Sequence, residues 1–189
     1  FDIDKATKTI VDSGLAYNTI YDVAGNVVTD PSQINGGFSR FCSSSLFEGD
    51  EFGAGRGIVD TLFFTGEENG NGTEWVLDPA TGDLWAAPMM GRGSWENVTQ
   101  ISTGNTSHVA FVLDDDSSPG PLYLYIGEKD PNGGFLARNG LDDGKVYALK
   151  MDADGIDLPT EFASGVSTAT WIEVNNFDPA KAGTAGYDA

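Results

Sequence analysis

The sequence predicts an all-β fold, and three observations support this prediction. Short apolar stretches recur roughly every ten residues along most of the chain, a spacing typical of strands in sandwiches and barrels. Glycine, proline, aspartate and asparagine separate these stretches, as expected of tight turns. Residues Lys145–Lys150 also alternate between apolar and polar side chains, which is the period of a half-buried strand.

Residues 1–37 are interpreted as an N-terminal extension. A short helix is predicted within residues 1–18, where Asp4 could serve as its N-cap. The apolar residues of this segment fall roughly on one helical face: Ile3, Ile10, Val11 and Leu15. Residues 21–39 are rich in turn-forming residues, and they are predicted to hold turns around one short strand, Asn26–Thr29.

Residues 38–174 are predicted to carry the strands of the domain. The turn Asp78–Asp83 lies between two apolar stretches and predicts a hairpin. Residues 48–57 are predicted to form an acidic, glycine-rich loop, and residues 175–189 a tail without a strong pattern. The predicted strands are 60–66, 74–77, 84–87, 97–102, 108–113, 122–126, 145–150 and 168–174.

Two architectures fit this rhythm, a β-propeller and a β-sandwich. A propeller blade takes roughly 40–50 residues, so the chain would hold only about three or four blades. Because that number is too small to close most propellers, the propeller interpretation predicts an incomplete propeller. The sandwich is the alternative.

The charge balance excludes some classes of partner. The 189 residues include 29 acidic and 10 basic ones, which gives a net charge of −19. Nucleic acids and anionic membrane surfaces need a basic protein surface, so neither is expected as a partner. No apolar stretch is long enough to predict a transmembrane helix.

Three acidic motifs lie beside predicted strands, and they indicate a metal site. Glu67 and Glu68 follow the apolar stretch Leu62–Thr65; Glu96 ends the glycine-rich turn Gly91–Glu96, just before a predicted strand. The third motif follows the predicted strand at 108–113 and consists of Asp114, Asp115 and Asp116. If these strand ends lie side by side, the carboxylates converge, and converging carboxylates repel unless a cation lies between them.

Other chemistry-bearing residues are few. Cys42 is the single cysteine, so no intrachain disulfide can form, and composition favours a buried thiol over a metal ligand. His108 is the single histidine and is expected to be structural, because neither a serine triad nor a histidine-rich zinc site can be built around it. The segment Asp152–Asp157 breaks the EF-hand pattern at Gly155, which favours a hairpin turn over a calcium loop.

Six motifs occur in order along the chain: Arg40–Ser43, Phe64–Glu68, Gly91–Asn97, Leu113–Asp116, Tyr123–Gly127 and Gly140–Tyr147. This ordered series resembles the PhoX-type alkaline phosphatases, in particular their divergent bacterial branch. The resemblance covers about residues 38–150. It implies an exported β-propeller (periplasmic, cell-surface or extracellular) that holds iron and calcium in its central channel and hydrolyses phosphate monoesters.

The resemblance also implies roles for individual residues. Cys42 matches the iron-binding cysteine, Glu68 matches an iron ligand, and Glu96 matches the glutamate of a Ser-His-Glu metal-binding motif. Asp115 and Asp116 match an acidic pair associated with calcium. Secondary candidates from the same motifs are Glu67, Asp114 and Arg92. No catalytic residue is assigned.

The chain departs from the family pattern at three places. Gly66 stands where a Cys-Glu-Glu pattern has its second cysteine, and Trp95 replaces the histidine of Ser-His-Glu. The later Arg-Pro-Glu-Asp motif, whose arginine and glutamate contribute to the phosphate and metal site, does not occur. On this interpretation the chain is an N-terminal part of a larger propeller, and the remainder is either missing or supplied by a second polypeptide.

The functional expectation is therefore a metal-dependent phosphatase of PhoX type, or a fragment of one, that uses Fe³⁺ and Ca²⁺. The alternative is a non-catalytic, calcium-binding exported propeller with a structural or surface-assembly role, which would not need Cys42. A third hypothesis is a calcium-dependent propeller hydrolase that acts on lactones or other esters without iron.

Overall fold

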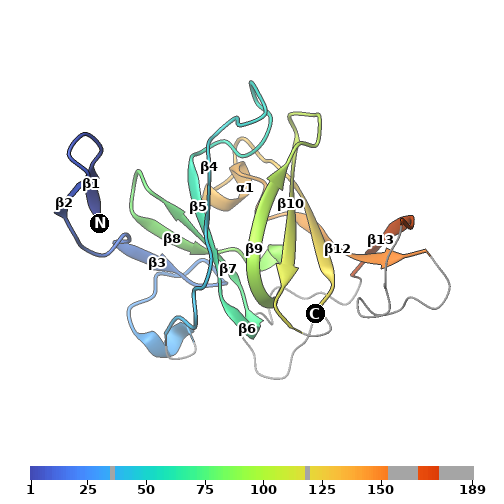
Figure 1. Ribbon diagram of the computed structural model, residues 1–189, viewed down its shortest axis with the longest axis horizontal. Helices are drawn as coiled ribbons and strands as arrows, with labels where there is room; N and C mark the ends of the chain where they lie inside the picture. The colour runs from blue at the N-terminus through green and yellow to red at the C-terminus, as the bar shows by residue number, and fades with distance from the viewer. Residues whose placement is uncertain (35–36, 118–119, 153–165, 175–189) are drawn as a thin grey trace.

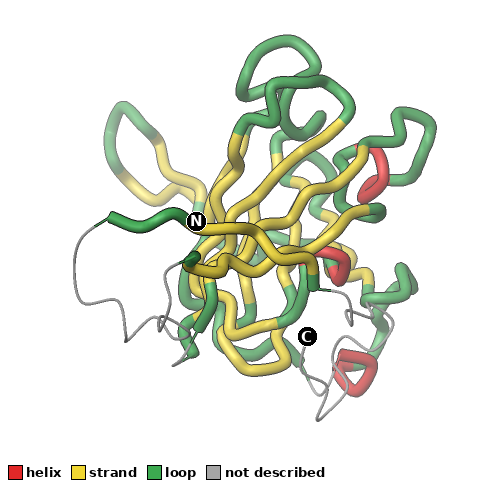
Figure 2. The backbone as a smooth tube through the Cα atoms, turned by 90° about the vertical axis from the view of Figure 1, so that its right-hand side faces the viewer, coloured by secondary structure: helices red, strands yellow, loops and turns green. Residues whose placement is uncertain are grey.

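The computed structural model describes residues 1–34, 37–117, 120–152 and 166–174. Strands dominate these residues, and helices are short (Figure 1, Figure 2). The described strands form one five-stranded sheet, one six-stranded sheet and a separate two-stranded hairpin. The all-β prediction is confirmed. Both larger sheets are open, so the propeller architecture remains a prediction.

The five-stranded sheet has the order β3-β8-β7-β5-β4. Its neighbours β4, β5, β7 and β8 pair antiparallel, whereas β3 joins β8 in parallel. The predicted hairpin around residues 78–83 is confirmed, because β7 and β8 pair directly across that turn. The strands are β3 (Thr19–Tyr21), β4 (Ser45–Phe47), β5 (Leu62–Gly66), β7 (Glu74–Asp78) and β8 (Asp83–Ala86).

The six-stranded sheet has the order β13-β12-β11-β10-β9-β6, and all of its neighbours are antiparallel. Four of its strands, β10, β11, β12 and β13, occur where the sequence predicts them. The strands are β6 (Glu68–Gly72), β9 (Gly93–Ile101), β10 (His108–Asp115), β11 (Leu122–Glu128), β12 (Gly144–Met151) and β13 (Ala169–Glu173).

Two strands differ from the prediction near the acidic motifs. β9 begins at Gly93 rather than at residue 97, so Glu96 lies on a strand and not in a turn. β6 begins at Glu68, in a segment for which no strand is predicted. Its sequence is rich in glycine and asparagine, which disfavour strands, and it pairs with β9 through an irregular register between Glu68 and Gly72. Pairing with β9 therefore overrides the local preference.

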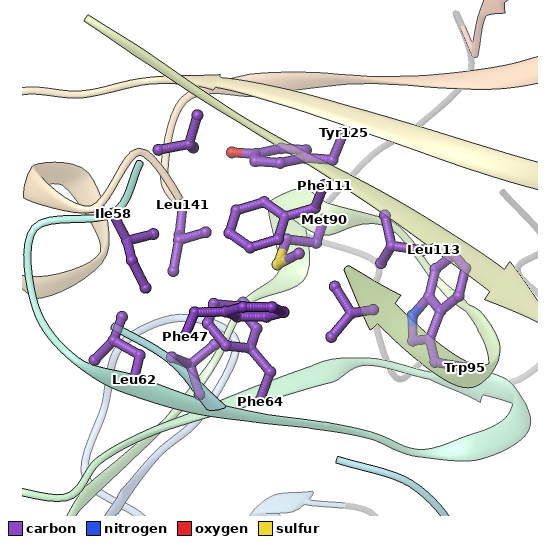
Figure 3. Packing of buried hydrophobic residues seen from close by; sticks show 14 of the residues in the cluster. Phe47, Ile58, Leu62, Phe64, Met90, Trp95, Phe111, Leu113, Tyr125 and Leu141 are labelled. Atoms are coloured by element: carbon purple, nitrogen blue, oxygen red, sulfur yellow. The ribbon is translucent and has the colours of Figure 1, made fainter. Parts of the chain in front are cut away.

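The main core lies between the two larger sheets. Phe64 on β5 and Phe111 on β10 face each other with ring centroids 5.2 Å apart, and Phe47 on β4 packs edge-on against both rings. Figure 3 shows these rings in the cluster, with Trp95 at one end. The period of a strand explains this packing: burial alternates along most of β9, and the alternate residues Val109, Phe111 and Leu113 of β10 belong to the core cluster.

The five-stranded sheet is covered on its other face as well. There the buried residues are Trp75, Leu77, Leu84 and Ala86, and the side chains that cover them come largely from the N-terminal segment. Phe38 packs edge-on against Trp75 with ring centroids 4.9 Å apart. Because both faces of the five-stranded sheet are covered, every residue of β7 is buried.

The acidic loop between β4 and β5 is attached to the six-stranded sheet by polar contacts. The Nζ atom of Lys129 donates hydrogen bonds to the carbonyl oxygens of Gly55 (2.7 Å) and Gly57 (2.8 Å). The Oδ1 atom of Asn139, which is fully buried, accepts hydrogen bonds from the backbone N–H groups of Val59 (2.9 Å) and Asp60 (3.0 Å).

The helix predicted within residues 1–18 is wrong. The segment forms an antiparallel hairpin of β1 (Asp2–Asp4) and β2 (Thr9–Asp12), which lies to one side of the sheets in Figure 1. Asp4 caps a turn instead of a helix, since its Oδ1 atom accepts hydrogen bonds from the backbone N–H groups of Ala6 and Thr7. The β-branched residues of β2 favour this hairpin.

The remaining local predictions have mixed outcomes. The strand predicted at 26–29 is reduced to a single bridge between Val27 and Tyr21, because Asp22 holds a turn by accepting hydrogen bonds from Ala24 and Asn26.

The short helices are η1 (Pro31–Ile34), η2 (Pro88–Met90) and α1 (Phe135–Arg138). In the described part of the chain, no helix has the length and hydropathy needed to cross a bilayer.

Two predicted segments fall wholly or mostly outside the described residues. The loop predicted at 152–157 lies beyond them from residue 153 onward, and the predicted tail, 175–189, lies beyond them entirely.

Candidate metal centre

Three of the predicted ligands lie together in the structure. Cys42, Glu68 and Glu96 each offer one ligand atom, and these atoms all lie within 4.8 Å of one another. The three residues come from the segment before β4, the first position of β6 and the middle of β9. Since β4 and β6 are edge strands of the two larger sheets, the cluster forms where the two sheets meet.

Backbone contacts hold the Cys42 segment against both neighbouring strands. Phe41 forms a β-bridge with Glu67, and the backbone N–H of Glu68 donates a hydrogen bond to the carbonyl oxygen of Arg40 (3.1 Å). These contacts flank Cys42 on its N-terminal side and fix its distance from Glu68.

A second set of contacts fixes the same segment to β9 and β5. The Ser43 hydroxyl donates a hydrogen bond to the carbonyl oxygen of Glu96, and the carbonyl oxygen of Ser43 accepts one from the Thr65 hydroxyl (2.9 Å). The Ser45 hydroxyl donates to the carbonyl oxygen of Val98 (3.1 Å). The three candidate ligands are therefore positioned by the fold itself.

Glu68 is the most informative member of the cluster. Only 3% of the residue is exposed. Its Oε1 atom lies 2.7 Å from the Nη2 atom of Arg40, whereas its buried Oε2 atom has no hydrogen-bond partner in the described part of the protein. A buried carboxylate oxygen without a partner is costly, and such an atom calls for a specific explanation, such as an ion. A cation bound beside Cys42 and Glu96 would satisfy it.

The charges around Glu68 give a second indication. Asp116 lies beside the Glu68 carboxyl group, and their interaction is the largest cause that raises the pKa of Glu68; the neighbouring thiol and Arg40 act in the opposite direction. Hydrogen bonding with Glu68, together with the negative charges of Glu68 and Glu96, raises the pKa of Cys42. Without a cation these groups therefore resist losing their protons, and a bound cation would reverse that preference.

The two aspartates at the end of β10, Asp115 as its last residue and Asp116 directly after it, have different positions. Asp116 adjoins Glu68, and its backbone N–H donates a hydrogen bond to the carbonyl oxygen of Ser94 (2.9 Å). Asp115 accepts backbone hydrogen bonds from Ser117 (2.7 Å) and Ser94 (3.4 Å). Asp115 thus stabilises the turn, while Asp116 completes the acidic surroundings of the cluster.

The secondary candidates lie next to the cluster. The Oε1 atom of Glu67 accepts a hydrogen bond from the backbone N–H of Ser39 (3.0 Å), so this carboxylate already has a partner. Asp114 is partly buried and pairs in register with Asn97 of β9. Arg92 is buried immediately before β9.

One further residue, Cys42, differs from the sequence-based expectation, and the position of His108 is compatible with the structural role expected of it. The composition-based prediction of a buried Cys42 thiol is wrong, since Cys42 is exposed; it lies in the connection before β4 rather than on a core-facing strand position. His108 is the first residue of β10, and its Nδ1 atom lies 2.8 Å from the hydroxyl of Ser107.

Sequence reasoning missed two charged residues of this region. Arg40 belongs to the Arg40–Ser43 motif, but nothing in the motif indicated its ion pair with Glu68. Glu74 is 1% exposed at the start of β7, and burial raises its pKa to about 8. No periodic signal predicts a buried carboxyl group at this position, because both faces of β7 are covered.

The donor set defines which metals the cluster could hold. A thiolate with carboxylates suits a ferric ion, and carboxylates with backbone carbonyls suit calcium. Comparison with known proteins adds no further constraint: no family model, no curated protein and no solved structure matches the chain.

Proposed function

We propose that the protein is a metal-dependent phosphatase of PhoX type, or part of one, which hydrolyses phosphate monoesters. The proposal rests on the convergence of Cys42, Glu68 and Glu96. One atom of this cluster, the buried Oε2 of Glu68, has no described hydrogen-bond partner. The order of the motifs along the sequence supports the same family.

In this proposal Cys42, Glu68 and Glu96 hold Fe³⁺, and the acidic residues at the end of β10, Asp115 and Asp116, hold Ca²⁺. When bound, the metal ions supply a Lewis acid that polarises the phosphoryl group and activates an oxygen nucleophile. The chain itself contributes a prepositioned ligand set, because backbone contacts from β5, β6 and β9 fix the Cys42 segment before any ion arrives.

The topology is compatible with two consecutive blades of a propeller. β4, β5, β7 and β8 form one antiparallel sheet, and β9 to β12 form the next one along the chain. The two sheets pack face to face, and the cluster lies between the segment before β4 and the paired strands β6 and β9. We propose accordingly that the protein is exported and that the channel is completed by further blades, for which a second polypeptide is one source.

A non-catalytic, calcium-binding exported propeller is the second candidate. The raised pKa of Cys42 favours it, since a protonated thiol is a poor metal ligand. Asp115, which already stabilises a turn, would then have a purely structural role. In this case the thiol contributes neither to metal binding nor to stability.

Metal content measured by elemental analysis tests the proposal. We expect the purified protein to contain iron and calcium, and we expect Cys42→Ser and Glu68→Gln to lose the iron. Glu48→Gln, which alters an exposed carboxylate outside the cluster, should retain both metals. Calcium without iron, unchanged in Cys42→Ser, would replace the phosphatase proposal with the structural one. Hydrolysis of phosphate monoesters compared with lactones, measured on the same purified protein, separates the phosphatase from the iron-free hydrolase of lactones or other esters.

A further inference from the structure

We infer that Arg40 binds the phosphoryl oxygens of the substrate at the mouth of the metal centre. This inference rests on the proposed phosphatase function and adds a substrate-binding residue to it. The resemblance to the PhoX-type family assigns no role to Arg40. The inference rests on the ion pair of Arg40 with Glu68, on the exposure of its side chain and on its backbone conformation.

The Arg40–Glu68 ion pair is unusually asymmetric. The Glu68 side chain is 1% exposed, whereas the Arg40 side chain is 64% exposed, although Nη2 and Oε1 lie only 2.7 Å apart. A guanidinium group carries five N–H donors in a planar fork. The described contact occupies one nitrogen of the fork, so the rest of the group faces solvent directly beside the candidate ligands.

The metal and Arg40 would use different oxygens of the same carboxylate. Arg40 contacts Oε1, and Oε2 is the atom without a described partner. A metal held by Oε2 would not displace the Arg40 contact at Oε1. The remaining N–H groups of this exposed guanidinium could then donate charge-assisted hydrogen bonds to an oxyanion bound beside the candidate ligands.

The backbone of Arg40 is held in place at an energetic cost. Its φ angle is 50°, in the left-handed region that residues other than glycine rarely adopt. The hydrogen bond from Glu68 to the Arg40 carbonyl and the bridge between Phe41 and Glu67 secure this conformation. Strained backbone that neighbouring contacts enforce is found preferentially at functional sites.

The charge of the protein makes such a residue necessary for an anionic substrate. The chain has a net charge of −19, and carboxylates from Glu68, Glu96 and Asp116 surround the site. These groups repel a phosphate dianion, so a fixed positive charge beside the metal is needed to select it. Arg40 is a basic residue that the described structure places in contact with the cluster.

Binding of inorganic phosphate to the metal-loaded protein tests the inference. Isothermal titration calorimetry would compare the wild type with Arg40→Gln, Arg40→Lys and, as a matched control, Arg56→Gln, which removes an exposed arginine from the loop before β5. Metal content is measured on the same samples. We expect Arg40→Gln to weaken phosphate binding by about 10- to 100-fold at unchanged metal content, the loss of one or two charge-assisted hydrogen bonds.

The outcomes separate the two proposals. Partial recovery in Arg40→Lys and wild-type binding in Arg56→Gln would support a direct contact with phosphate. Unchanged phosphate binding in Arg40→Gln with a full metal complement would overturn the role of Arg40 and leave the phosphatase proposal standing. Loss of metal in Arg40→Gln would make Arg40 a residue that positions Glu68. A wild-type protein that binds no metal would overturn both proposals.

Discussion

Gly66 and Trp95 are in such close contact that no side chain fits at Gly66. A Cβ atom built on Gly66 would lie 2.4 Å from the Cβ of Trp95 and 2.8 Å from the Oε1 atom of Glu74. These are also two of the positions at which the sequence departs from the PhoX pattern, where a cysteine and a histidine would stand. The contact is made by the Cβ atom and backbone of Trp95, which a histidine would share, so it excludes a side chain at Gly66 whichever of the two residues stands at position 95.

We predict that Gly66→Ala and Gly66→Cys lower the free energy of unfolding by about 1–3 kcal/mol, because both overpack a rigid site. Urea denaturation measures this change. Gly70→Ala is the matched control, since a Cβ atom at Gly70 meets nothing within 4 Å. Equal stability of the Gly66 and Gly70 variants would show that Trp95 can move aside.

The buried carboxyl group of Glu74 predicts a pH-dependent stability. Its pKa rises from 4.5 to about 8 in the native state, so between these values the native state binds one more proton than the unfolded state. The free energy of unfolding should therefore fall as pH rises through this window, by up to about 1.4 kcal/mol per pH unit. Thermal unfolding between pH 5 and 8 provides the measurement.

Glu74→Gln serves as the comparison for this effect. The amide keeps the shape of the protonated acid and cannot ionise, so the variant should gain stability relative to the wild type as pH rises. Glu68 also has a raised pKa, but that contribution is common to both proteins and cancels in the difference. Parallel pH profiles for the two proteins would contradict the assignment of this dependence to Glu74.

The pairing of strands could be predicted from sequence where the chemistry is local. The Asp78–Asp83 turn predicts the β7–β8 hairpin, and the alternation at Lys145–Lys150 predicts β12. The N-terminal hairpin was missed because Ile3 and Ile10, which pair across it, also fit a helical period. β6 was missed because its ladder with β9 is a long-range property of the sheet.

The candidate site shows the same contrast between local features, which the sequence predicts, and long-range contacts, which it does not. Cys42, Glu68 and Glu96 could be named from motifs, but their convergence depends on the meeting of two sheet edges. The ion pair of Arg40 with Glu68 links two segments, and no pattern within either one records it.

The raised pKa values of the cluster predict that metal binding strengthens with pH. A metal that binds the Cys42 thiolate must displace its proton, and hydrogen bonding with Glu68, together with the negative charges of Glu68 and Glu96, raises the pKa of that thiol. We expect affinity to rise by about tenfold per pH unit near neutrality for each proton released. Titration with Co²⁺, followed by its thiolate absorption band, measures this slope. Cys42→Ser should lack the band, and a pH-independent affinity in the wild type would exclude the thiolate as ligand.

We predict that the Asn139 side chain stabilises the loop before β5. Its side chain accepts hydrogen bonds from Val59 and Asp60 and donates to Asp60 and to the carbonyl oxygen of Phe135. Asn139→Ala leaves these partly buried groups without their partner and should cost about 1–3 kcal/mol, whereas exposed Asn97→Ala should change stability by less than about 0.5 kcal/mol. Thermal unfolding and amide exchange of Val59 test this; unchanged exchange would show that water replaces the amide.

The contact of Lys129 with the carbonyl oxygens of Gly55 and Gly57 has a consequence for how the protein responds to chelators. Carbonyl oxygens of this kind often surround a bound calcium ion, but here the positive charge is covalently attached to the chain. A chelator can empty the centre at Cys42 and Glu68, yet it cannot remove an ammonium group. We therefore expect the backbone amides of the acidic loop to stay protected from hydrogen exchange after a chelator removes the metals. The amides of β6 should lose protection in the same sample, so the loop serves as the unchanged control.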